Sequence, residues 1–173
     1  MKKIFKPSSG YPAFFQQYLD VIPNDGNLLL HLRNILEETE QLVIDLPEEM
    51  LLYRYAEGKW TIKDTLVHVS DCERVLIYRA MRIARGDKTA LPGFDEELLA
   101  AHANANKRPL TDILNELETL RTANIIFIGT LNDEALDRTG TANGNPVSAR
   151  LLVNQIYGHH RHHLNIIRER YLA

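Results

Sequence analysis

The chain has 173 residues, of which 45% are hydrophobic and 25% charged, and its net charge is −3 with neutral histidines. This length is sufficient for one domain with a single core, and without a clustered excess of Lys and Arg we expect no nucleic-acid binding. The lone cysteine, Cys72, cannot form an intrachain disulfide and favours a reducing compartment. The sequence has no apolar run near the ~18 residues of a membrane span and no apolar signal-peptide region. We therefore expect a soluble, cytoplasmic protein.

Helical periodicity dominates the sequence, and strand-like alternation is almost absent. The four segments that carry it cover residues 26–46, 61–86, 110–131 and 146–171. Thr61 followed by Asp64 resembles a capping box at a helix start, Gly86 is typical of a helix end, and Pro146 suits a first helical turn. The pattern predicts an all-α protein, a four-helix bundle that occupies residues 1–173 as one domain.

The predicted connections between these helices are unequal. The longest, from Gly86 to Pro109, contains DEELLAAHANAN, which predicts a short additional helix. A short amphipathic segment, Tyr11 to Ile22, precedes the bundle and is a candidate to cap it.

The stretch GHHRHH, residues 158–163, holds four of the seven histidines. At 100° per residue, His159 and His163 lie on the apolar stripe of the last helix, since they share an arc of ~80° with Leu152, Ile156 and Ile166. His160 and His162 point ~70–90° away from its centre and are expected on the flanks or in solvent. The inward pair is spaced i,i+4, close enough for both imidazoles to bind one ion.

Two inward imidazoles form either a hydrogen-bonded core pair or part of a metal site, which needs a third ligand. His68 in the second helix is the best candidate, although it lies ~100° from the centre of that helix's apolar stripe. Of the other histidines, His31 flanks the stripe of the first helix and His102 falls in the long connection.

Three further residues carry two interpretations each. Glu73 is either a buried ion-pair partner of an arginine or an acceptor that orients a ligand imidazole. Cys72 is a small buried hydrophobe or a thiolate ligand, and the former is the more common role. Arg108 is a surface arginine or a contact for an anionic substrate.

Two blocks of this sequence resemble the DinB/YfiT-like superfamily. YRYAEGKWTIKDTLVHVSDCERVLIYRAMRIARGD is similar to its second-helix signature and GHHRHHLNIIRERYL to its closing helix. The intervening FDEELLAAHANANKRPLTDILNELETLR and NPVSARLLVNQIYGHHRHH are similar as well, so the resemblance covers roughly residues 25–173.

The resemblance implies a four-helix bundle that binds a divalent ion through one histidine of the second helix and two of the last. Carried onto this chain, the ligands are His68, His159 and His163. His160 stands where related chains often have an acidic residue, which changes the charge near the mouth of the site. Zinc and nickel both suit imidazole ligands.

The resemblance and the histidines together favour a metal-dependent enzyme acting on a small molecule, either a hydrolase or a transferase that uses a low-molecular-weight thiol. The alternative is a non-catalytic, stress-associated bundle whose metal is structural or vestigial. The apolar side chains of Tyr11, Phe14 and Phe15 also lead us to expect a homodimer.

Overall fold

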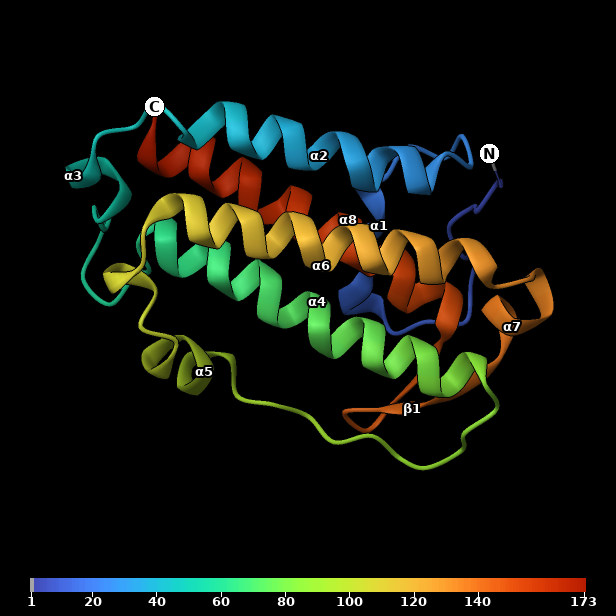
Figure 1. The fold of residues 1–173 in the computed structure, drawn as a ribbon. Helices are drawn as coiled ribbons and strands as arrows, with labels where there is room; N and C mark the ends of the chain where they lie inside the picture. The colour runs from blue at the N-terminus through green and yellow to red at the C-terminus, as the bar shows by residue number, and fades with distance from the viewer. Residues whose placement is uncertain (1) are drawn as a thin grey trace.

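Four long helices form the framework of the protein, for which a computed structural model describes residues 2–173 (Figure 1). They are α2 (Leu28–Val43), α4 (Ile62–Ala84), α6 (Leu110–Thr130) and α8 (Ala149–Ile166), and α8 continues into a π-helical turn, η3 (Ile167–Tyr171). The predicted all-α four-helix bundle is confirmed.

Shorter elements connect and flank these helices. They are η1 (Ala13–Phe15), α1 (Gln16–Asp20), α3 (Glu48–Leu51), α5 (Glu96–His102), η2 (Ala105–Lys107) and α7 (Asp133–Asp137). α5 is the short helix predicted within the long connection. The predicted N-terminal segment forms η1 and α1, and α1 packs against α8.

The ends of α4 follow from the local sequence. The Thr61 side chain accepts a hydrogen bond from the backbone N–H of Asp64, whose carboxylate accepts one from the N–H of Thr61, completing the capping box. Beyond the other end, Gly86 has a φ of +87°, a left-handed conformation that glycine adopts without steric cost.

The start of the last helix differs from the prediction. Pro146 lies in a β-hairpin formed by β1 (Thr139–Ala142) and β2 (Asn145–Ser148), and the helix begins only after Ser148. The Ser148 hydroxyl accepts from the N–H of Leu151 and caps the helix. Four-residue strands are too short to produce a clear alternation, and the hairpin turn at Asn143–Gly144, where both residues have positive φ, separates them.

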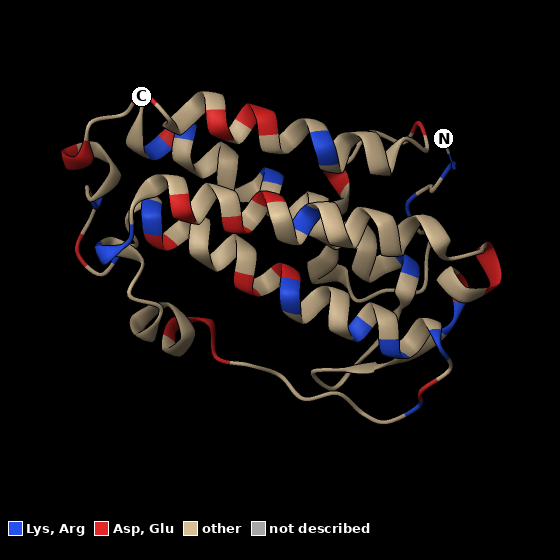
Figure 2. Cartoon of the chain, in the orientation of Figure 1, with Lys and Arg blue, Asp and Glu red and all other residues tan. Residues whose placement is uncertain are grey.

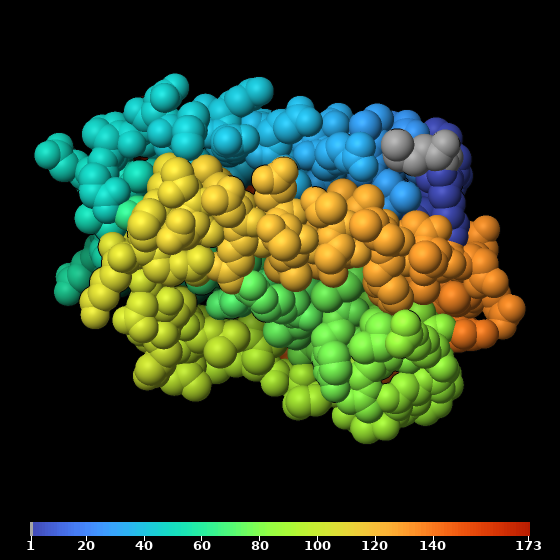
Figure 3. Space-filling model, in the orientation of Figure 1, coloured from blue at the N-terminus to red at the C-terminus, as the bar shows by residue number. Residues whose placement is uncertain are grey.

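The order of the helices explains the unequal connections. In Figure 1, α4 and α6 run in the same direction, and α2 and α8 run in the opposite one. The chain leaving α4 must therefore return along the whole bundle before α6 begins, and residues 86–109, with α5 and η2, make this crossover. Figure 3 shows the crossover packed along one side of the molecule, next to α4.

The apolar core consists of two clusters separated by a polar layer. On α4, one cluster ends at Val67 and the other begins at Leu76. Between them, α4 contributes His68, Cys72 and Glu73, all buried. The layer is completed by buried polar side chains from the facing helices, which are Arg121, Asn124, His159 and His160. Burying polar groups is costly unless they have partners. This layer is therefore where we look for a functional site.

Acidic and basic residues are interspersed along the helices rather than gathered in one stripe of a single sign (Figure 2). Within residues 2–173, the helices lack the combination of length and apolar character that a bilayer-crossing segment requires.

Candidate metal centre

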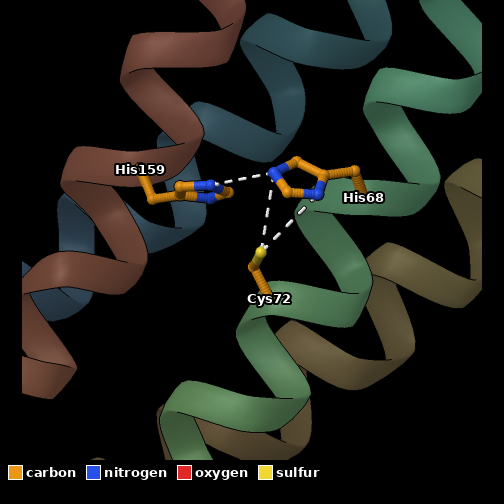
Figure 4. Close-up of side chains that lie close together, drawn as sticks. All are labelled: His68, Cys72 and His159. Atoms are coloured by element: carbon orange, nitrogen blue, oxygen red, sulfur yellow. Dashed lines mark hydrogen bonds between the residues drawn. The ribbon is translucent and has the colours of Figure 1, made fainter. Parts of the chain in front are cut away.

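Three histidine rings meet between α4 and α8. Nε2 of His68 lies 3.1 Å from Nε2 of His159, and Nε2 of His163 lies 3.2 Å from the same atom. The ring centroids of His68 and His163 are 4.8 Å apart, so the three rings form one group. Figure 4 shows His68 and His159 approaching each other from the two helices.

Protons alone cannot satisfy this arrangement. Nε2 of a neutral imidazole has either one hydrogen or one lone pair in the ring plane. Nε2 of His159 can therefore form a hydrogen bond with one neighbouring nitrogen, and its second contact remains unsatisfied. Since Zn–N distances are ~2.0–2.1 Å, nitrogens at these separations would subtend about 100° at a shared ion, between octahedral and tetrahedral angles. The His68–His159 and His159–His163 separations are therefore each compatible with two imidazoles on one divalent cation.

The surroundings keep these imidazoles neutral. Burial lowers the pKa of His68 to about 4. Burial, and then the neighbouring histidines, lower the pKa of His159 and His163 well below the usual value. Neutral rings have a lone pair free for a metal, which protonated rings lack.

Aromatic side chains enclose the histidines on two sides. The Trp60 ring lies 4.4 Å from the His68 ring and 6.3 Å from that of His163, centroid to centroid. The indole N–H donates to Glu97 of α5, which ties this ring to the crossover. On the other side, the Tyr18 ring of α1 lies 5.9 Å from the His159 ring. Neither Trp60 nor Tyr18 was singled out from the sequence, because each comes from a segment outside the predicted bundle helices.

Cys72 is a fourth donor close to the histidines. Its Sγ lies 3.5 Å from Nε2 and 3.7 Å from Nδ1 of His68, one helical turn away (Figure 4). Donor atoms of His68, Cys72 and His159 all lie within 4.8 Å of one another. Burial raises the pKa of the Cys72 thiol to about 12, so without a metal it is a neutral thiol.

The expectation that His160 lies on the flank or in solvent is wrong. His160 is only 1% exposed, because α2 and the Arg121 side chain of α6 cover the side of α8 from which it projects. Its Nδ1 accepts a hydrogen bond from Nη2 of Arg121 at 3.1 Å, since arginine can only donate. Nε2 therefore carries the proton and donates to the Thr39 hydroxyl at 2.9 Å, which in turn donates to the Ile35 carbonyl.

Glu73 is held by the same network. Its carboxylate accepts from Nε of Arg121 at 2.9 and 3.0 Å and from the side-chain amide of Asn124 at 2.9 Å. No hydrogen bond joins it to an imidazole within residues 2–173. The structure thus places Glu73 as an ion-pair partner of an arginine.

Arg108, His31 and His102 bond to partners outside the group of three rings. Arg108 pairs with Glu116 at the start of α6. His31 pairs with Asp25, and His102 bonds the Leu98 carbonyl within α5. His162 is half-buried and flanks the group, with its ring edge-on to those of Tyr18 and His163.

The fold and this cluster define a class of helical bundle with a candidate metal centre between two helices. The DinB superfamily model matches residues 31–167, and the chain belongs to that superfamily. A protein from Oceanobacillus iheyensis, named "Putative metal-dependent hydrolase", is 28% identical over 126 residues, which are 72% of each chain.

Two solved structures share the fold. One is described as "YfiT from Bacillus subtilis is a probable metal-dependent hydrolase with an unusual four-helix bundle topology". It has a TM-score of 0.79 and 17% identity, over 96% of this chain and 91% of that one. The other is a mycothiol-dependent maleylpyruvate isomerase, with a TM-score of 0.63 and 16% identity, over 85% of this chain and 61% of that one.

Proposed function

We propose that this protein is a metal-dependent enzyme in which His68, His159 and His163 bind one divalent ion and that it hydrolyses a small molecule. The observation that carries the proposal is that the Nε2 atoms of His68 and His163 lie 3.1 and 3.2 Å from Nε2 of His159, an arrangement in which hydrogen bonds cannot satisfy both contacts. The name of the Oceanobacillus relative and the description of YfiT support both the metal and the hydrolase class.

The ligand set suits catalysis. Three imidazoles leave at least one coordination position for water or substrate, the usual pattern of catalytic zinc sites. A divalent ion in such a site lowers the pKa of bound water and polarises a substrate carbonyl. The protein's own contribution is to hold neutral ligands in place and, through the Trp60 ring, to cover one side of them. Zinc and nickel are the ions we propose, because both bind imidazole well.

A second candidate reaction is transfer to or from a low-molecular-weight thiol. The mycothiol-dependent isomerase shows that this fold also supports thiol-dependent chemistry. The only thiol of this chain, Cys72, is 5% exposed and faces His68, so the reacting sulfur would come from a cosubstrate.

The non-catalytic alternative rests on Cys72. If its sulfur joined the three imidazoles at the ion, four protein ligands would close the site, as in structural zinc sites. The bundle would then be a stress-associated protein that the metal stabilises.

Metal content decides whether the site exists. Protein purified without an affinity tag is analysed by elemental mass spectrometry as wild type and as His68→Ala, His159→Ala and His163→Ala. We expect about one divalent ion per wild-type chain and large losses in each variant. His162→Ala, in the same GHHRHH stretch, is the matched control and should keep the ion. Unchanged metal in the triad variants would refute the site.

Folding of the same variants separates the two roles. Far-UV circular dichroism and thermal unfolding are measured on each metal-free variant. A folded, metal-free protein supports the catalytic interpretation, whereas unfolding on metal loss supports the structural one.

We further propose a single-domain, cytoplasmic homodimer. Phe14 is 51% exposed and supplies apolar surface for self-association, whereas Phe15 is buried in the core and does not. Sedimentation at micromolar concentration tests this, and a monomer would refute it.

A further inference from the structure

A cavity of about 220 Å³ leads to the candidate metal centre from the side of α1 and the hairpin, and both Cys72 and His159 line it. Its other walls come from α4, α8, the crossover and the turn between β1 and β2. The crossover and the hairpin are not part of the four-helix framework, and both contribute residues to the wall of this cavity.

The cavity contains a buried cation without an anionic partner. Arg79 of α4 lines it, is only 8% exposed, and also borders a neighbouring pocket that Pro92 and Phe94 line. Its Nη2 donates to the Pro92 carbonyl at 2.6 Å, and its guanidinium lies 5.6 Å from the centroid of the Phe94 ring. Within residues 2–173, no carboxylate lies within ion-pair distance of it. By contrast, Arg74 and Arg82 of the same helix each pair with an aspartate.

Burying a charge without a counter-ion is costly, so an unpaired buried arginine in a cavity indicates an anionic ligand. The Pro92 carbonyl occupies one donor of the guanidinium and orients its plane. The remaining donors are free to form the paired hydrogen bonds that arginine makes with carboxylates. Glu96 also lines the cavity, but it is exposed and forms no ion pair with Arg79.

A second polar atom in this cavity also lacks a partner. Oε1 of Gln155, on α8 one turn before His159, is buried and accepts no hydrogen bond within the described chain. It can accept from a ligand N–H or O–H. The rings of Phe15 and Phe94 supply apolar surface nearby. The cavity therefore offers a cation, an acceptor and aromatic walls beside a ligand histidine.

We propose that this cavity is the substrate site and that Arg79 anchors a carboxylate of a small substrate whose apolar part packs against Phe15 and Phe94. The substrate class is thus a small carboxylate with an aromatic or branched body, placed with its reacting group toward His159. This inference rests on the proposed function for its chemistry, but the anion site can be tested without the metal.

The test uses two probes of the same shape, phenylacetate and neutral phenylacetamide. Their affinities for the full-length protein are measured by isothermal titration calorimetry, both zinc-loaded and metal-stripped. The stripped protein is the decisive arm, because a carboxylate can also bind zinc directly. We expect phenylacetate to bind stripped wild type at least ~10-fold tighter than phenylacetamide, as for a charge-assisted contact.

Substitutions then assign the preference to Arg79. Arg79→Gln should remove it and Arg79→Lys should retain part of it, since lysine keeps the charge but not the fork. Arg85→Gln is the matched control. Arg85 follows the last residue of the same helix, α4, is exposed, and contacts Phe127 rather than the cavity. It should leave both affinities unchanged.

Equal or undetectable binding of the two probes at millimolar concentration in stripped wild type would overturn the proposal, as would a preference that persists in Arg79→Gln. Should Arg79→Gln fail to fold, the wild-type comparison and Arg79→Lys still decide. The two proposals fail differently: a protein that binds no metal but prefers phenylacetate through Arg79 contradicts only the metal centre. Stoichiometric metal without that preference contradicts only the anion site.

Discussion

Arg121 of α6 and Glu73 of α4 form a fully buried ion pair at the centre of the bundle, with Nη2 2.8 Å from Oε2 and the two side chains 0% and 1% exposed. Arg121 also donates to the Leu32 carbonyl of α2 and to His160 of α8. One guanidinium thus joins all four long helices in the layer that holds the candidate ligands.

Neutralising this pair should destabilise the protein strongly. Glu73→Gln keeps the size of the side chain but leaves the Arg121 charge buried and uncompensated, which costs about 3–5 kcal/mol. Glu116→Gln is the control: Glu116 pairs with arginines at a half-exposed site, where about 1 kcal/mol or less is expected. Urea unfolding measures both. Equal free energies of unfolding for the two variants would contradict a structural role for the network.

Gly158 in α8 should tolerate no side chain. A Cβ there would lie 2.2 Å from the Tyr18 carbonyl oxygen of α1, a backbone atom that cannot rotate away. Gly158→Ala is therefore expected to displace α1 and lower the free energy of unfolding by about 1–3 kcal/mol, the usual cost of overpacking. Gly129→Ala in α6 is the control, because its Cβ would meet only Leu29 at an ordinary 3.8 Å. That change should be neutral or stabilising by up to ~1 kcal/mol.

Gly158→Ala should also affect metal binding by the histidines. Tyr18 packs against the rings of His159 and His162, so loosening α1 should weaken metal retention more than Gly129→Ala does. Dialysis against a graded series of chelator concentrations compares the two variants. If both variants retained the metal equally well, α1 would have no role in holding the metal centre.

Acid should weaken the contact between α2 and α8 through Glu38. Hydrogen bonds from Arg161, and then from Arg168, lower the pKa of Glu38 from 4.5 to about 2. Its stabilisation is therefore complete above the unfolded value of 4.5 and is lost as the pH falls toward 2. Because these ion pairs are partly exposed, the contribution is about 1 kcal/mol.

The difference in thermal stability between wild type and Glu38→Gln isolates the contribution of Glu38 from that of the other carboxylates. Thermal unfolding is followed from pH 6 down to the lowest pH at which the fold persists. The two curves should converge on acidification. A gap that stays constant with pH would show that the carboxylate charge contributes nothing.

The inward placement of His159 could be predicted from the sequence because α8 has one apolar stripe and a single helical period locates each residue on it. The burial of His160 could not be predicted in this way, because α1, α2 and α4 cover more than one face of α8. The helical period shows on which face a residue lies but not whether another element covers that face. The same holds for His68: the first half of α4 is buried all round by α3, the crossover and α8, so its stripe has no clear edge. Family resemblance, rather than periodicity, selected it.

The cavity beside His159 was beyond sequence reasoning for a different reason. Its walls come from α1, α4, the crossover, the hairpin and α8, so they meet only in the folded chain. Arg79 stands in α4 among other arginines, and nothing in the local sequence marks it as the unpaired one. Pro146 favoured a helical first turn, but a strand pairing with Thr141 decided its conformation.

Cys72 decides whether the proposed metal centre is open or closed. Its Sγ is 3.5 Å from Nε2 of His68, near enough to join an ion with a small side-chain rotation. In the cobalt-substituted protein, a sulfur ligand gives a strong thiolate-to-cobalt charge-transfer absorption that imidazoles do not. We expect wild type to lack this band and Cys72→Ala to keep the cobalt, because burial favours the neutral thiol and three imidazoles already supply a catalytic ligand set. Cys72→Ser, which is polar but a poorer ligand, controls for the loss of volume. A charge-transfer band that disappears in both variants, together with loss of cobalt, would show a closed site and favour the structural role.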